Sequence, residues 1–327
     1  MTIHVALLND YQRIALTLAP WETLAPAVSV RAFSIKFADE NEAAAKLEEF
    51  DIVMAMRERQ PFPRALLERL PRLKMIASAG RRNAAIDLNA CTDLGILVCG
   101  TTSSIRPTVE FTWAAMLALM RHIPAEVEAT RSGKWQISLG TELAGKTLGL
   151  MGLGRIGAQV AELALAFKMR LLAWSPHLTP ERAQECGATH VSLERLLRES
   201  DIVTIHLGLG PGTRGLIGAR ELGWMRPSAY LVNTSRGPIV DEAALVAALE
   251  RKAIAGAALD VFTTEPLPKD HPLLALDNAL VTPHLGGHTL EHRAEYYLGA
   301  LENIKAYLSG APERVMNPEV LPKYRRP

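Results

Sequence analysis

The sequence predicts an α/β protein made of two doubly wound domains, each built around a parallel β-sheet. Two observations carry this prediction: short apolar runs alternate with segments of helical period along most of the chain, and a glycine-rich turn near its middle joins one such run to a helix. Runs that are apolar throughout are typical of parallel strands, because helices cover both faces of a parallel sheet. The length of 327 residues also suits two domains of ordinary size.

The first series of apolar runs predicts one sheet in the first third of the chain. We expect helices between its strands, and Asp39, three residues before Glu42, forms a capping-box variant that predicts a helix over 43–50. The expected strands are 4–8, 28–34, 51–56, 73–79 and 96–99.

A second series predicts the other sheet. A final helix over 290–308 carries Tyr297, Leu301 and Ile304 at helical spacing, and we expect it to return to the first domain. The prediction is therefore a discontinuous first domain, 1–101 plus 289–327, with 102–288 inserted in it. The expected strands of the second series are 147–151, 170–174, 202–207, 229–232, 257–261 and 280–282.

The boundary between the domains is expected at the polar stretch 101–107, which ends in the helix-resistant Pro107. The helix predicted after it, 110–121, is apolar on more than one face. Such a helix is covered either within its own domain or by a second copy of the chain. The sequence leaves both open, and we expect a homodimer.

Composition excludes several classes of protein. The 36 Lys and Arg nearly balance 35 Asp and Glu, which argues against nucleic acid or an anionic membrane as a partner. The 3 cysteines are an odd number without a C-x-x-C pair, so we expect neither a disulfide framework nor a thiolate metal site. The N-terminus resembles no targeting signal, and the apolar run 113–120 is too short to span a bilayer. These features predict a soluble, cytoplasmic protein.

The strongest local signal is a G-x-G-x-x-G turn formed by Gly152, Gly154 and Gly157, with Arg155 and Ile156 before the last glycine. It follows the strand 147–151 directly, and a helical segment and another strand come after it. In that context the glycines permit a tight turn, and a pyrophosphate can bind the N–H groups that begin the helix. The motif predicts a dinucleotide cofactor.

The choice of dinucleotide is left open by Ser175. It stands at the end of the next strand, where an acidic residue would accept the hydroxyls of the adenosine ribose. Without a carboxylate nothing repels a 2′-phosphate, so NADP(H) is at least as well suited as NAD(H). The alternative is that Ser175 is a neutral loop residue with little selectivity.

Arg236, Glu265 and His284 each follow an expected strand of the second sheet, so all three are placed at its carboxyl edge. An arginine can hold a carboxylate and polarise the adjacent carbonyl, a histidine can deliver a proton, and a carboxylate favours the protonated imidazole. The set suits reduction of a 2-oxo acid. Each residue alone also has an ordinary interpretation as a solvated or hydrogen-bonded side chain.

A metal site is the rival interpretation of the histidines. His284, His288 and His292 are spaced by four, as ligands on one helix would be. Gly286 and Gly287 interrupt that helix, so we expect no metal, with His288 either beside the cleft or at a helix start and His292 on the surface.

Together these motifs resemble the D-isomer-specific 2-hydroxyacid dehydrogenase family. The resemblance rests on the glycine turn, on 233–241 around Arg236, on 259–267 around Glu265 and on 282–284, and it is thinner in the first hundred residues. It implies a Rossmann cofactor domain inserted in a flavodoxin-like substrate domain. It also implies hydride transfer between NAD or NADP and a small 2-oxo or D-2-hydroxy acid.

The resemblance further implies roles for individual residues. Arg236 would bind the carboxylate and keto oxygen of the substrate, His284 would donate and accept the proton, Glu265 would pair with His284, and Asp260 would orient the nicotinamide carboxamide. The remaining cofactor candidates are Gly152, Gly154, Arg155, Ile156, Gly157, Ser175, Thr213, Thr234, Ser235, Gly286 and Gly287. The remaining substrate candidates are Arg57, Ala79, Gly80 and Arg81.

Arg81 and Arg82 make the expected substrate loop more cationic than is usual for the family, and Arg57 adds to this. We hypothesise that a second anionic group of the substrate is accepted there, against the alternative of solvated arginines. Two other functions stay open: a dinucleotide-sensing interaction protein of the same architecture, and a formate or phosphonate oxidant. The residues do not name the physiological acid.

Overall fold

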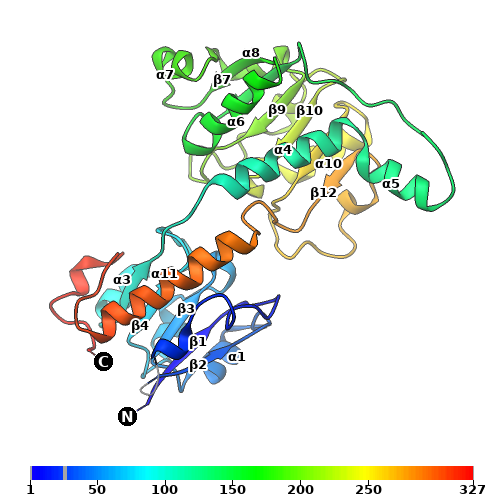
Figure 1. Ribbon diagram of the computed structural model, residues 1–327. Helices are drawn as coiled ribbons and strands as arrows, with labels where there is room; N and C mark the ends of the chain where they lie inside the picture. The colour runs from blue at the N-terminus through cyan, green and yellow to red at the C-terminus, as the bar shows by residue number, and fades with distance from the viewer. Residues whose placement is uncertain (1, 25–27, 327) are drawn as a thin grey trace. The chain divides into compact units, whose positions relative to one another are not determined.

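The computed structural model describes residues 2–24 and 28–326, which form two compact units (Figure 1). Unit 1 comprises Met1–Ser104 and Thr289–Pro327, and unit 2 comprises Ile105–His288. The chain thus changes unit after 104 and after 288, where the prediction placed the changes after 101 and 288. Each unit is an α/β sandwich with its own parallel sheet, so the predicted fold class is confirmed.

Unit 1 has a five-stranded parallel sheet in the order β2-β1-β3-β4-β5, the flavodoxin-like order. Each strand begins and ends within two residues of the bounds expected from the sequence. Its strands are β1 Ile3–Leu7, β2 Val28–Ala32, β3 Ile52–Ala55, β4 Met75–Ser78 and β5 Leu97–Gly100.

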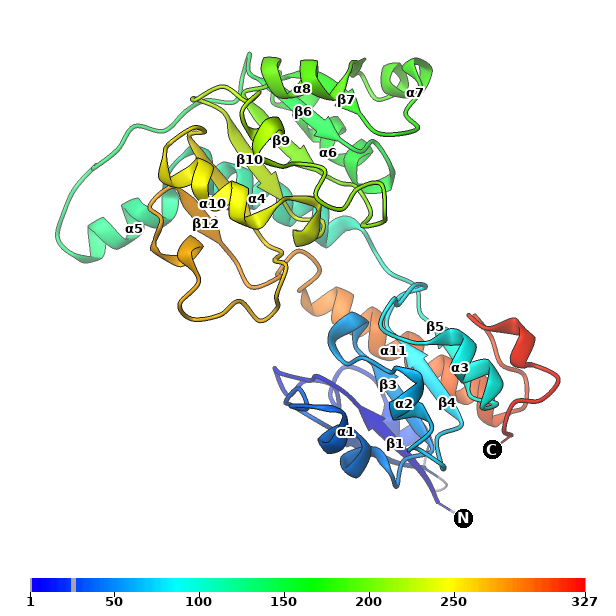
Figure 2. The ribbon, with the colours of Figure 1, turned by 180° about the vertical axis from the view of Figure 1, so that it is seen from behind.

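Helices cover both faces of this sheet. The helices α1 (Glu40–Leu47), α2 (Arg64–Leu67) and α3 (Leu88–Asp93) pack on one face, and α11 (Leu290–Leu308) packs against β4 and β5 on the other (Figure 2). The carboxylate of Asp39 accepts the N–H groups of the first turn of α1, so the helix begins three residues before the predicted 43. The helix α11 has the predicted bounds and returns the chain to unit 1.

Unit 2 has a seven-stranded parallel sheet in the order β12-β11-β10-β9-β6-β7-β8. The order reverses between β6 and β9, which is the switch point of a Rossmann sheet. The edge strand β8 was not predicted, because two residues are too few to show a period. The strands are β6 Thr147–Met151, β7 Arg170–Trp174, β8 Thr189–His190, β9 Ile202–Ile205, β10 Tyr230–Asn233, β11 Gly256–Leu259 and β12 Ala279–Val281.

Helices also cover both faces of the second sheet, with α4 and α10 on opposite faces (Figures 1 and 2). The helix α4 begins at Arg106, four residues earlier than predicted, because Pro107 occupies its first turn, where no N–H group needs a partner. The helices are α4 Arg106–Met120, α5 Ile123–Arg131, α6 Arg155–Ala166, α7 Pro180–Glu185, α8 Leu193–Glu199, α9 Ala219–Leu222 and α10 Glu242–Glu250.

Most of the apolar surface of α4 is covered inside unit 2. It packs against α6 and β11, and the Trp113 ring stacks on the Phe167 ring with centroids 4.7 Å apart. Of the residues that suggested an outward apolar face, Ala114 alone is exposed, while Ala115 and Leu119 are buried. Burial within its own unit therefore accounts for this helix.

The cysteines are unpaired thiols. Cys91 and Cys99 are buried, and burial raises the pKa of each to about 12, so both stay protonated at neutral pH. No helix in the described part of the chain is both long and apolar enough to cross a membrane.

Candidate active site

The glycine turn joins β6 to α6 at the switch point of the unit 2 sheet. Gly152 has a φ of +101°, and its N–H donates to the Trp174 carbonyl at 2.8 Å. A Cβ added at Gly157 would overlap the Gly152 carbonyl oxygen, so the helix can approach the turn only with glycine there. Gly154 differs, because nothing lies within 4 Å of a Cβ built on it. Packing within the protein therefore does not require a glycine at this position.

The N-terminus of α6 suits an anionic group. Gly154 is the N-cap and supplies no side-chain acceptor to the first turn, so the N–H groups of Arg155 and Ile156 have no side-chain cap. A dinucleotide pyrophosphate fits a glycine-lined turn with uncapped N–H groups at a helix start. The residues present thus fit the predicted cofactor.

His206 supports this turn, and sequence reasoning missed it. It follows β9 with its N–H bonded to the Met151 carbonyl at 2.8 Å, and a Cβ at Gly152 would lie 2.8 Å from its carbonyl oxygen. Burial lowers the pKa of His206 to about 4, so its imidazole is neutral at pH 7. The feature of the sequence that could have indicated His206 is its position directly after an expected strand of this sheet.

Ser175 follows β7 and is partly buried. Its carbonyl accepts the N–H of Leu178 at 3.2 Å, and the next residues, Pro176 and His177, are exposed. Nearby Arg182 is paired with Glu185 at 2.8 Å. Thr213 lies in the loop after β9, where its hydroxyl donates to the Gly208 carbonyl at 2.7 Å and so shapes the loop itself.

The loop after β10 carries the predicted arginine. Thr234 is buried with its hydroxyl 2.8 Å from that of Thr112, and the hydroxyl of Ser235 donates to the Leu207 carbonyl. The Arg236 Nη1 donates to the Ser235 carbonyl at 2.7 Å. A Cβ added at Gly237 would overlap the backbone carbonyl of Phe262, so glycine is what lets this loop lie against the loop after β11.

Asp260 joins that loop to the one after β12. It is buried, and its Oδ1 accepts the Thr282 hydroxyl and the Leu285 N–H, each at 2.7 Å. Its Oδ2 accepts the Gly286 N–H at 2.7 Å. Burial raises the pKa of Asp260 although these donors favour the carboxylate. Both oxygens therefore hold the loop that carries His284, an arrangement that the sequence did not indicate.

Glu265 and His284 form the central pair of the site. The His284 Nδ1 lies 2.7 Å from the Glu265 Oε2, and the Glu265 Oε1 accepts the Phe262 N–H at 3.0 Å. His284 has a left-handed backbone with a φ of +56°, an uncommon conformation that is often found at functional sites. Burial raises the pKa of Glu265, but the hydrogen bond from His284, the N–H of Phe262 and the charge of Arg236 together hold it below its usual value.

The expected substrate loop lies in unit 1, after β4. The Gly80 N–H donates to the Thr101 hydroxyl oxygen at 2.9 Å, and the guanidinium of Arg57 covers the side of Gly80 on which a Cβ would stand. The Arg57 Nη1 also lies 3.5 Å from the Ala79 carbonyl oxygen. Arg57 and Gly80 both have positive φ, so the loop is held in a conformation that few residues adopt freely.

A family model described as the NAD binding domain of D-isomer specific 2-hydroxyacid dehydrogenases matches residues 113–286. The chain belongs to this family. That stretch contains the glycine turn, Arg236, Glu265 and His284.

Relatives of this dehydrogenase agree with the family match. It is 45% identical over 273 residues to a glyoxylate reductase of Aeropyrum pernix, with 80% of this chain and 81% of that protein covered. It is 39% identical to a D-3-phosphoglycerate dehydrogenase of Synechocystis over 85% of this chain but only 51% of that longer protein.

Solved structures of similar proteins cover nearly the whole chain. A phosphoglycerate oxidoreductase from Vibrio cholerae superposes with a TM-score of 0.89 at 32% identity, covering 95% of this chain and 100% of that one. A glyoxylate reductase from Paecilomyes thermophila superposes with a TM-score of 0.76 at 30% identity, covering 96% and 98%. The protein is thus an oxidoreductase that uses a nicotinamide cofactor and acts on the CH–OH group of a 2-hydroxy acid.

One prediction about this dehydrogenase is wrong. His292 is not on the surface but buried in α11, with its Nε2 3.1 Å from the Ser103 hydroxyl and its ring 4.3 Å from that of Tyr296. It faces the unit 1 core because α11 packs its buried face against that sheet. Among the residues that the structure describes, no three His, Cys, Asp or Glu side chains gather where they could hold a metal ion.

Proposed function

We propose that this dehydrogenase reduces a small 2-oxo acid to the D-2-hydroxy acid, with His284 as the proton donor. The observation that carries the proposal is the 2.7 Å contact between the Glu265 Oε2 and the His284 Nδ1. A carboxylate can only accept, so the Nδ1 carries a proton and the Nε2 is the nitrogen left to serve the substrate. Glu265 thereby fixes the orientation of the ring and stabilises its protonated form.

Arg236 binds the substrate, and His284 transfers the proton. The guanidinium of Arg236 binds the carboxylate of the acid and polarises the neighbouring keto oxygen. The reduced nicotinamide, when bound at the glycine turn, supplies the hydride. Protonated His284 gives its Nε2 proton to the keto oxygen in the reduction, and neutral His284 takes that proton back in the oxidation.

The substrate and the cofactor are both tested by one assay panel. Glyoxylate and hydroxypyruvate, with other 2-oxo acids, are incubated with NADH and with NADPH in parallel. We expect turnover of at least one of these acids with at least one cofactor. Binding of a dinucleotide without turnover of any acid would instead favour a sensing protein, and oxidation of formate or phosphonate would favour the other alternative.

We expect NADPH to serve at least as well as NADH, and Ser175→Asp to reverse this. A carboxylate at the end of β7 would repel the 2′-phosphate and accept the ribose hydroxyls of NADH. A cost of about 1–2 kcal/mol corresponds to a loss of roughly tenfold in kcat/KM for NADPH. Steady-state kinetics with both cofactors measure it, with Ser175→Ala as the control. An equal loss with NADH would show that Ser175 does not select the cofactor.

Glu265→Gln is expected to move the high-pH limb of the reduction profile to lower pH. The pKa of Glu265 lies below its usual value, so its contribution to the pair is present above about pH 4.3 and is lost only as the pH falls through the lowered pKa. Across pH 5–9 the glutamate is therefore ionised and favours protonated His284. Glutamine removes that charge and keeps the shape. Profiles of kcat/KM for both proteins that superimpose would contradict the pairing role.

We also propose that copies of the chain pair through α5 and the segment after it. Trp135 and Leu139 are 78% and 93% exposed, and the Glu126 carboxylate accepts the Ser138 N–H at 2.7 Å, which holds the segment to α5. Large apolar side chains exposed together on an anchored segment are typical of an interface.

The double variant Trp135→Ser and Leu139→Ser is expected to be monomeric in light scattering, whereas the wild type is dimeric. The matched control is Leu16→Ser, which removes an exposed apolar side chain from unit 1. A dimeric double variant, or a monomeric wild type, would contradict this interface.

A further inference from the structure

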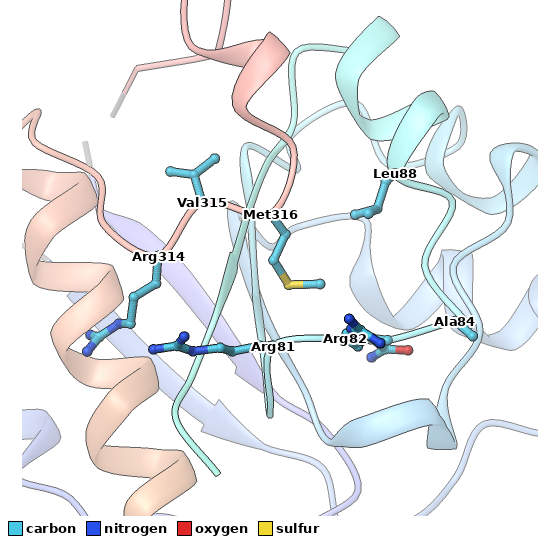
Figure 3. Close-up of a pocket in the computed structure, with 8 residues that line it drawn as sticks. Arg81, Arg82, Ala84, Leu88, Arg314, Val315 and Met316 are labelled. Carbon is cyan, nitrogen blue, oxygen red and sulfur yellow. The ribbon is translucent and has the colours of Figure 1, made fainter. Parts of the chain in front are cut away.

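Unit 1 contains a cavity of about 580 Å³ that no part of the hydride-transfer chemistry explains. Figure 3 shows it between the loop after β4, the first residue of α3 and the segment that follows α11. It is lined by Arg81, Arg82, Asn83, Ala84, Leu88, Arg314, Val315 and Met316.

The C-terminal wall of the cavity is fixed to the edge of the unit 1 sheet. Val315 pairs antiparallel with Cys99 of β5, and the Arg314 carbonyl accepts the Gly100 N–H at 2.9 Å. The Met316 N–H donates to the Val98 carbonyl at 2.7 Å. Backbone hydrogen bonds to β5 therefore hold this wall in place.

The loop wall is fixed as well. Asn83 is buried, and its Nδ2 donates to the Arg57 carbonyl at 2.8 Å while its Oδ1 accepts the Ala85 N–H at 3.0 Å. A Cβ built on Gly100 would stand 3.1 Å from the Arg81 Cα and 3.2 Å from the Met316 sulfur, so both walls pack against β5 at Gly100. Hydrogen bonds therefore fix both walls of the cavity.

The side chains that line the cavity carry only positive charge. Its lining includes three arginines and no acidic residue. Arg314 is held in place, with its Nε donating to the Asn303 Oδ1 at 2.8 Å and its Nη2 to the Glu302 carboxylate at 2.9 Å. The guanidiniums of Arg81 and Arg82 make no hydrogen bond or ion pair with any residue that the structure describes.

The lining of the cavity shows which arginines can bind the second anionic group expected from the sequence. Arg57 is not part of the lining, since its guanidinium lies against Gly80 and Ala79 instead. Arg81 and Arg82 do line the cavity, and Arg314, which the sequence did not suggest, lines it with them. In the view of Figure 3, Arg81 extends towards α11 and Arg314 extends down from the C-terminal segment, while Arg82 lies apart from both, beside Ala84.

We propose that this cavity binds a compact dianionic oxyanion group, a phosphate or its equivalent, on a small organic molecule. Arginine forks match the oxygens of such a group with two parallel N–H donors each, and two forks without acidic partners gain most from it. Leu88, Val315 and Met316 supply apolar contact for the remainder of the ligand. The anion is either the second acidic group of the 2-oxo acid or a separate metabolite, and only this choice rests on the proposed function.

Binding is tested without turnover. Inorganic phosphate is titrated calorimetrically into the protein saturated with oxidised cofactor, so that the glycine turn is already filled. We expect the double variant Arg81→Met and Arg82→Met to bind phosphate at least tenfold more weakly than the wild type, and Leu88→Trp to do the same by filling the cavity without removing charge. Arg251→Met, at an exposed arginine of unit 2, is the matched control and is expected to bind as the wild type does. Equal phosphate binding by the wild type and the double variant would overturn the proposal.

The source of the anion is tested by inhibition, once turnover of a monoanionic acid such as glyoxylate has been measured. Phosphate that competes with glyoxylate, and loses this competition in the double variant, identifies the group as part of the substrate. Inhibition or activation that is not competitive, and is again lost in the double variant, identifies a separate ligand. A phosphate effect that is unchanged in the double variant would count against the cavity. If no 2-oxo acid is turned over, the proposed function fails while the calorimetric result stands on its own.

Discussion

Replacing His284 by alanine is expected to lower the turnover of 2-oxo acids by about 100- to 10,000-fold, the usual range for general acid catalysis. The imidazole, oriented by the 2.7 Å contact to Glu265, is the group that we assign to proton delivery. Alanine leaves the glycine turn and the Asp260 network untouched, because neither uses the His284 side chain. The dissociation constant of the cofactor should therefore stay nearly constant. Steady-state kinetics and fluorescence titration of the cofactor measure the two quantities separately.

A second histidine–glutamate pair in the same unit supplies the control. The His271 Nε2 lies 3.2 Å from the Glu242 Oε1, so His271→Ala removes a comparable pair that has no assigned part in the reaction. We expect its turnover to stay close to that of the wild type. A His284→Ala enzyme that retains full activity, or a His271→Ala enzyme that loses as much, would show that the proton comes from elsewhere.

The strands could be predicted well because buried parallel strands are short apolar runs, and the predicted β6 and β7 have the bounds that the structure gives them. Errors occurred where a local pattern competes with position in the fold. The local pattern around Pro107 predicts a barrier to helix formation, but this proline stands in the first turn of α4, where it is tolerated. The strand β8 is defined by its hydrogen bonds to β7 and not by any pattern of its own.

In the candidate site, too, the residues themselves could be predicted from the sequence, whereas the contacts that hold them could not. Arg236, Glu265 and His284 could be named because each follows a strand, and parallel strands end at one edge. What holds them could not be predicted, since it depends on contacts between loops that are distant in sequence. Asp260 bonding to the His284 loop and Arg314 lining the cavity of unit 1 are such contacts. The burial of His292 was missed because it follows from which face of α11 packs on the unit 1 sheet.

Replacing Gly237 by alanine is expected to lower both the thermal stability of unit 2 and the turnover of the enzyme. The added Cβ would overlap the backbone carbonyl of Phe262, and backbone cannot rotate away as the end of a side chain can. The loops after β10 and β11 must therefore separate, which moves Arg236 away from Glu265. Overpacking of this kind costs about 1–3 kcal/mol, or roughly 2–12 °C in Tm for a domain of this size.

Gly154→Ala is the informative comparison, since nothing lies within 4 Å of a Cβ there and its φ of −77° is open to alanine. We expect its Tm to stay within about 2 °C of the wild type, while its affinity for the cofactor falls because the methyl group occupies the space beside the uncapped N–H groups. Gly237→Ala should show the opposite pattern, with a lowered Tm and a loss of kcat at saturating cofactor. Differential scanning calorimetry and cofactor titration on both variants distinguish the two. If Gly237→Ala melted and turned over as the wild type does, the contact between the two loops would not be what places Arg236 beside Glu265.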